Sequence, residues 1–96
     1  MSATVNGREY SRGTLATIHR SFDQMISYAS RGTRLVPGDI IGSGTVGTGC
    51  ILELSRVHGV DVYPWLVAGD RVRLEIERLG HIEAVIEPAV GVLPLN

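Results

Sequence analysis

The run "GSGTVGTGCILEL", residues 42–54, holds the residues of this sequence best suited to chemistry. Gly42, Gly44 and Gly47 fit the G-x-G-x-x-G pattern of dinucleotide-binding loops. Such a loop must open a helix whose N-terminus holds the pyrophosphate. After the glycines we expect a short buried strand, because the apolar run ends quickly at His58-Gly59. The sequence therefore argues against a nucleotide site here.

Two polar residues in this run are candidates for a functional role. Glu53 is a carboxylate between Leu52 and Leu54, and in a strand it would face away from both, near the glycines. A charge among apolar neighbours needs a partner or a function. Thr45 follows Gly44, which lets the backbone approach a ligand closely. Two structural alternatives stay open: Thr45 capping its own turn, and Glu53 paired with an arginine.

Composition excludes several classes of function. The chain has 96 residues, nine basic and ten acidic, and every basic residue is arginine. The absence of lysine removes Schiff-base chemistry and the P-loop lysine. A charge near zero and few aromatic residues argue against nucleic acid as a partner. Cys50 is the only cysteine, which fits a reducing compartment, and no apolar stretch is long enough for a membrane span. We therefore expect a cytoplasmic protein with no membrane partner.

No metal site is predicted within this chain. Glu75 and Glu77 have the spacing of a ligand pair, but arginines alternate with them along what looks like a solvated strand. His19, His58 and His81 are scattered, with no acidic partner at ligand spacing. We interpret all three as surface histidines.

The remaining pattern predicts a β-rich α+β fold with one helix packed on the sheet. Asn6-Gly7 indicates a tight hairpin turn. Apolar residues recur every three or four positions from Leu15, and a capping box at Ser21–Gln24 places the regular helix at about 21–31. The strands are expected after the Gly-Asp turns in 35–44 and 66–76 and again in 81–86.

Strict alternation from Val72 to Ile76 gives the sheet one apolar face. Ile82 and Ile86 extend this face, which is large for one short helix to cover. The sequence therefore predicts self-association as well as a core.

The runs "MISYASRGTRLVPGDIIGSGTVGTGCILEL" and "WLVAGDRVRLEIERLGHI" closely resemble the C-terminal part of the fumarylacetoacetate hydrolase family, from about Val5 to Ile86. The resemblance implies that residues 1–96 are part of a catalytic domain with a mixed β-roll fold that assembles as a homo-oligomer, a dimer in the family. It also implies metal-dependent hydrolysis of a carbon–carbon bond in a small β-diketo or oxo acid. Relatives decarboxylate, tautomerise or dehydrate similar acids.

The resemblance also implies roles for individual residues. Thr45, with Gly44, matches the threonine that holds the substrate carboxylate, and Glu53 matches the glutamate that pairs with a histidine to activate water. The divalent metal, Mg²⁺, Mn²⁺ or Ca²⁺, would be bound by carboxylates upstream of the matching region, where the catalytic histidine and lysine also lie. Two functions follow: a hydrolase to which this chain contributes the carboxylate loop, or a non-catalytic module that needs a second copy or a partner chain.

Overall fold

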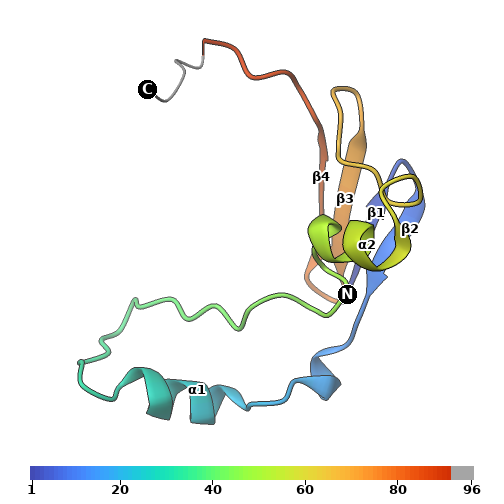
Figure 1. The fold of residues 1–96 in the computed structure, drawn as a ribbon. Helices are drawn as coiled ribbons and strands as arrows, with labels where there is room; N and C mark the ends of the chain where they lie inside the picture. Colours follow the sequence, from blue (N-terminus) through green and yellow to red (C-terminus); the bar gives the residue numbers. More distant parts are fainter. Residues whose placement is uncertain (92–96) are drawn as a thin grey trace.

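The computed structural model describes residues 1–91, which form an antiparallel four-stranded sheet and two α-helices (Figure 1). The strand order is β2-β1-β3-β4. This confirms the β-rich α+β class. The elements are β1 Ser2–Val5, β2 Arg8–Arg12, the 3₁₀ turn η1 Leu15–Thr17, α1 Phe22–Ala29, α2 Ile51–His58, β3 Arg71–Ile76 and β4 Gly80–Val85.

The predicted Asn6-Gly7 hairpin is present between β1 and β2. Both residues have positive φ, 51° and 80°, as a turn with two left-handed positions requires. The same turn also joins the hairpin to β3. The Asn6 N–H donates to Arg71 O at 2.8 Å, and the Asn6 side-chain oxygen accepts from the Arg71 N–H at 2.9 Å.

Asp70 completes this junction at the start of β3. Its carboxylate accepts from the Val67 N–H at 2.8 Å and from the Asn6 side-chain amide at 2.8 Å. These two bonds favour the ionised form and lower the pKa of the Asp70 carboxyl, with the Val67 backbone bond the larger cause. The junction is therefore sensitive to acid.

We expect Asp70→Asn to flatten the loss of stability in acid. Because folding lowers the Asp70 pKa, its stabilising effect is fully present above the unfolded pKa and disappears as the pH falls through the folded value. Urea midpoints measured between pH 7 and about pH 2.5 should fall more steeply for the wild type than for Asp70→Asn. Equal slopes would show that these hydrogen bonds do not couple to folding.

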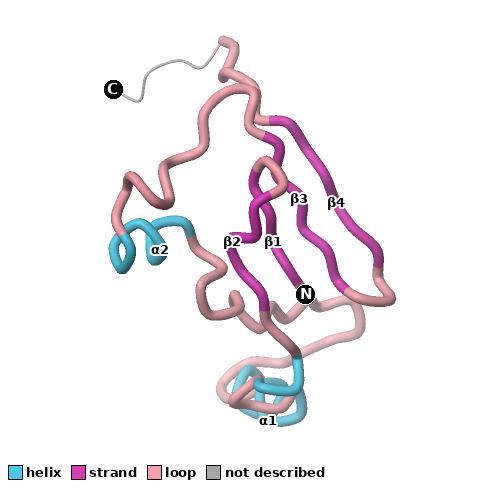
Figure 2. Tube along the Cα trace, turned by 90° about the vertical axis from the view of Figure 1, so that its right-hand side faces the viewer, coloured by secondary structure: helices cyan, strands magenta, loops and turns pink. Residues whose placement is uncertain are grey.

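Helix α1 begins where the capping box predicts. The Ser21 hydroxyl accepts from the Gln24 N–H at 3.3 Å, and the Gln24 side chain accepts from the Ser21 N–H at 3.1 Å. The expectation that a single helix packs on the sheet is wrong. Helix α1 lies apart from the strands (Figures 1 and 2), and Phe22 and Ile26 are about half exposed, at 47% and 49%.

The second helix, α2, replaces the short buried strand expected at residues 50–56. Helical spacing places Ile51, Leu54 and Ser55 on one face, and these three are the residues of the helix that are buried or half-buried. Gly59, with φ 100°, ends the helix. The apolar residues Ile51, Leu52 and Leu54 suggested a buried strand, but the positions that are buried or half-buried follow the period of a helix. A helix therefore does follow the glycine run.

The two Gly-Asp turns have the same geometry but different continuations. In the first, the Val36 N–H donates to the Asp39 carboxylate at 2.9 Å and the Asp39 N–H donates to Val36 O at 3.1 Å. Val67 and Asp70 repeat both bonds, at 2.8 and 3.1 Å. Only the second turn leads into a strand. The strand expected within 35–44 does not form, because this segment has no neighbouring strand to bond with in the described chain.

The apolar face of the sheet is largely open within residues 1–91. Strand β3 forms where alternation predicts it, but its burial does not alternate: Arg73 is half-buried, whereas Leu74 is 50% exposed and Ile82 on β4 is 72% exposed. Val5 and Leu54 are the only buried apolar residues among those described, and both keep a small exposed fraction. The radius of gyration, 17.2 Å, exceeds the roughly 12–13 Å of a compact domain of this size. The chain by itself thus covers little of its apolar surface.

Candidate functional site

The glycine run forms a loop that is seated on the end of β2. Ser11 is buried, and its hydroxyl lies 3.0 Å from the Thr48 hydroxyl and donates to Gly47 O at 3.5 Å. The Val46 side chain occupies the space where a Cβ on Gly13 would lie. These contacts tie the loop to a strand far from it in sequence.

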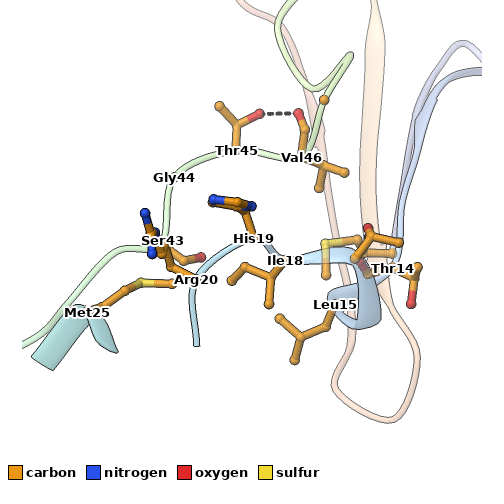
Figure 3. Close-up of a pocket in the computed structure, with 13 residues that line it drawn as sticks. Thr14, Leu15, Ile18, His19, Arg20, Met25, Ser43, Gly44, Thr45 and Val46 are labelled. Carbon is orange, nitrogen blue, oxygen red and sulfur yellow. Dashed lines mark hydrogen bonds between the residues drawn. The ribbon is translucent and has the colours of Figure 1, made fainter. Parts of the chain in front are cut away.

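Within the loop, a short turn brings Thr45 and Gly49 together. The Gly49 N–H donates to Val46 O at 2.9 Å, and the Thr45 hydroxyl donates to the same oxygen at 2.6 Å (Figure 3). Gly44 has φ 84°, a conformation that suits glycine. The threonine hydroxyl is thus bonded to its own turn, as the structural alternative for Thr45 predicts.

The backbone amides before this turn are not used by the fold. Among the hydrogen bonds of residues 1–91, none engages the N–H of Ser43, Gly44 or Thr45. Successive backbone donors beside a left-handed residue form a concavity that suits an anion. The loop therefore presents donors without a protein acceptor.

A pocket of about 440 Å³ opens between this loop and the segment that precedes α1 (Figure 3). Its volume is in the range of small-molecule sites. Leu15, Ile18, Met25 and Val46 give it apolar walls, and its polar walls include Ser43, Gly44, Thr45, His19 and Arg20.

A second pocket of about 240 Å³ lies on the sheet side of the same loop. Gly44, Thr45 and Val46 line both pockets, and Leu74 and Ile76 of β3 form part of the second one. Thr45 therefore stands at the wall between two cavities.

Glu53 lies in the first turn of α2 and outside the walls of both pockets. One of its oxygens, Oε2, accepts from the Thr48 N–H at 3.1 Å, which braces the glycine loop from the helix. In the described chain Glu53 forms no ion pair with an arginine, so the structural alternative proposed for it is not seen. Its second oxygen, Oε1, accepts no hydrogen bond from residues 1–91.

The candidate residues are thus only partly brought together. Thr45 and Gly44 line the same pocket. Glu53 does not line it, and it contacts the loop through the hydrogen bond that its carboxylate accepts from the Thr48 N–H. Three residues with a place at the site were missed. Ser11, which seats the loop, has no recognisable sequence signal, while the adjacent pair His19 and Arg20 could have been noticed as basic residues beside the capping box.

A nucleotide site remains excluded even though α2 follows the glycines. The segment before the loop is not a strand, and all three strand pairings are antiparallel, so no strand-loop-helix unit of a parallel sheet is present in residues 1–91. Cys50, at the N-cap of α2, makes no side-chain capping bond.

Comparison with known proteins identifies the chain. Residues 1–87 match the family described as fumarylacetoacetate (FAA) hydrolase C-terminal. A Burkholderia multivorans protein is 39% identical over 78 residues, and proteins of Burkholderia lata and Burkholderia cenocepacia are 36% identical over the same length. All three are named only as hydrolases, without a substrate. The chain belongs to the fumarylacetoacetate hydrolase family.

These alignments cover 80% of this chain but 25% of each relative. The chain thus spans about a quarter of the length of the curated relatives it matches. No solved structure matches it.

Proteins of this family are generally metal-dependent. Among residues 1–91, however, no three histidine, cysteine, aspartate or glutamate side chains come together as metal ligands would. Glu75, one of the two spaced carboxylates, accepts from Arg73 at 3.0 Å. These residues do not fit a metal centre. Neither α-helix of the described part has the length and apolar character needed to cross a membrane.

Proposed function

We propose that this chain supplies the substrate-carboxylate half of the active site of a hydrolase that cleaves a carbon–carbon bond in small β-diketo or oxo acids. The proposal combines the family membership with the geometry of the glycine loop. The metal ligands and the water-activating histidine would come from sequence outside this chain. The substrate carboxylate would lie against Gly44 and Thr45.

The observation that carries this proposal is the set of unused donors at the pocket. The N–H groups of Gly44 and Thr45 have no acceptor among residues 1–91, and the residues that line the larger pocket include no aspartate or glutamate. The Thr45 hydroxyl can rotate away from Val46 O and donate to a bound carboxylate instead. An anion would therefore gain several donors without meeting a like charge.

Glu53 would act through an imidazole supplied by another part of the protein. A carboxylate that accepts from one ring nitrogen fixes the tautomer, so that the other nitrogen can take a proton from water. Oε2 is committed to Thr48, and Oε1 has no partner in the described chain. Glu53 thus has one oxygen for the loop and one for a histidine.

A non-catalytic role is the second candidate, and the open sheet face favours it. Leu74 and Ile82 need a cover, which a second copy or a partner chain could provide. In that case the chain would bind a second copy or a partner chain and would catalyse no reaction. Cleavage of acetylpyruvate with Mg²⁺ or Mn²⁺ by a protein that combines this chain with the remaining sequence of a relative separates the two functions.

We expect the loop to bind carboxylates and not nucleotides. Thr45→Ala should weaken oxalate or pyruvate binding by about 1.5–3 kcal/mol, roughly ten- to a hundredfold, because a hydrogen bond to a charged group is lost. Calorimetric titration of the chain joined to upstream family sequence measures the effect, with NAD as a negative probe. Tight NAD binding would contradict the proposed function.

Two control variants test whether the hydroxyl itself is responsible. Thr45→Ser keeps the hydroxyl and should retain most of the affinity. Thr33→Ala removes an exposed threonine that lines neither pocket and should have no effect.

A further inference from the structure

Thr48 has an unusual backbone conformation at the junction between the glycine loop and α2. Among the described residues, three residues other than glycine have positive φ: Asn6, Thr48 and Arg78. Asn6 and Arg78 lie in the turns that join β1 with β2 and β3 with β4, and these hairpins account for their conformation. Thr48, with φ 67°, lies in a turn that joins no paired strands. It is also β-branched, and β-branched residues rarely adopt positive φ.

Two contacts with other segments hold Thr48 in this conformation. Its hydroxyl lies 3.0 Å from that of Ser11, a buried residue of β2, and its N–H donates to Glu53 Oε2 at 3.1 Å. Glycine or asparagine is the usual residue at a turn position with positive φ. Glycine would relieve the backbone here, but it has no hydroxyl to offer to Ser11. The threonine therefore links β2 to the carboxylate on α2 at the expense of a strained backbone.

We propose that Thr48 is a positioning residue that orients the Glu53 carboxylate toward the imidazole it supports. The inference rests on the proposed function, in which Glu53 acts through a histidine. The last side-chain torsion of glutamate is only weakly restricted, so a hydrogen bond to one oxygen decides where the other points. With Oε2 bonded to the Thr48 N–H, Oε1 is the oxygen left for a histidine. Strained residues persist where the surrounding structure fixes them, and they gather at functional sites.

The test is a double-mutant cycle on kcat for acetylpyruvate cleavage by the chain joined to the remaining sequence of a relative. Thr48→Val keeps the β-branched shape and removes the hydroxyl, so residue 48 loses its bond to Ser11. We expect kcat to fall about five- to tenfold, the usual effect of losing one hydrogen bond, with KM within about twofold of the wild type. In the Glu53→Gln background the same change should cause no further loss, because the carboxylate that Thr48 orients is already gone.

Three further variants separate positioning from a general effect on folding. Thr48→Ser keeps the hydroxyl and should have nearly the kcat of the wild type. Thr48→Gly adopts positive φ without strain, so it should fold, but it lacks the bond to Ser11 and should lose kcat as Thr48→Val does. Thr33→Val makes the same chemical change at an exposed threonine that lines neither pocket, and it should leave kcat unchanged.

Amide hydrogen exchange at residue 48 gives a readout that does not depend on turnover. Thr48→Val and Ser11→Ala should each speed this exchange about five- to tenfold, because either change frees the turn from β2. Unchanged exchange in both variants, or an equal loss of kcat from Thr48→Val with and without Glu53→Gln, would overturn the positioning role and leave the proposed function standing. Wild-type kcat in Glu53→Gln would overturn the catalytic role of Glu53 and the positioning role together.

Discussion

Glu53→Gln is expected to lower kcat by about a hundredfold or more while leaving KM nearly unchanged. Glutamine keeps a carbonyl oxygen that can accept from the Thr48 N–H, so the brace behind the glycine loop survives. It cannot stabilise an imidazolium as a carboxylate does, and the contribution of a general base is typically about 10²–10⁴-fold. Loss in kcat alone indicates an interaction made in the transition state.

The measurement is acetylpyruvate cleavage by the chain joined to upstream family sequence, followed under saturating metal. Glu77→Gln is the matched control, since it changes the same residue type at an exposed position just after β3 and should leave kcat unchanged. Wild-type kinetics in Glu53→Gln would show that this glutamate serves only to brace the loop.

Gly49→Ala is expected to abolish carboxylate binding and to destabilise the loop by about 1–3 kcal/mol, the usual cost of forcing a methyl group into a filled site. A Cβ at this position would meet the Thr45 hydroxyl and stand 2.8 Å from Val46 O. The backbone oxygen cannot swing aside as a long side chain could. The turn must therefore open, and Thr45 would leave the pocket wall.

Gly47→Ala provides the control for this steric argument. It lies two residues away in the same loop, has no positive φ, and a Cβ there would meet nothing within 4 Å. We expect it to bind oxalate as the wild type does, with an unchanged urea midpoint. Equal behaviour of the two variants would mean that the close approach of Gly49 to Thr45 is not needed for binding.

Local signals in the sequence predict the parts of the fold that depend on neighbouring residues. Asn6-Gly7 predicts its hairpin, Ser21 and Gln24 predict the start of α1, and alternation predicts β3. Elements that depend on distant partners were less predictable. Residues 35–44 read as a strand, but a strand needs a neighbour to bond with, and none lies beside this segment in the described chain.

Helix α2 was predictable in principle. Glu53 in its first turn, Arg56 and His58 in its last turn and Gly59 after it all agree with a helix. The apolar run outweighed these signals, because a short apolar stretch fits a buried strand and a buried helix equally well.

The candidate site divides in the same way. Gly44, which permits close approach of a ligand, and the family resemblance single out Thr45 and Gly44 in the sequence, and the structure places both beside a cavity. The sequence marks His19 and Arg20 as adjacent basic residues, but it does not place them or Ser11 beside the glycine loop, because the chain must first leave β2, pass through α1 and return. Only the three-dimensional path of the chain brings these residues close to the glycine loop.

The segment from Gly13 to Val46 leaves the sheet and returns to it at the same place, because Val46 fills the space beside Gly13 and Thr48 bonds to Ser11. The segment is therefore a closed loop in the polymer sense, and the entropic cost of closing such a loop grows only with the logarithm of its length. Doubling the length of this segment would cost about 0.6 kcal/mol. Insertions or deletions around α1 could thus rebuild the pocket wall at Arg20 without unseating the glycine loop.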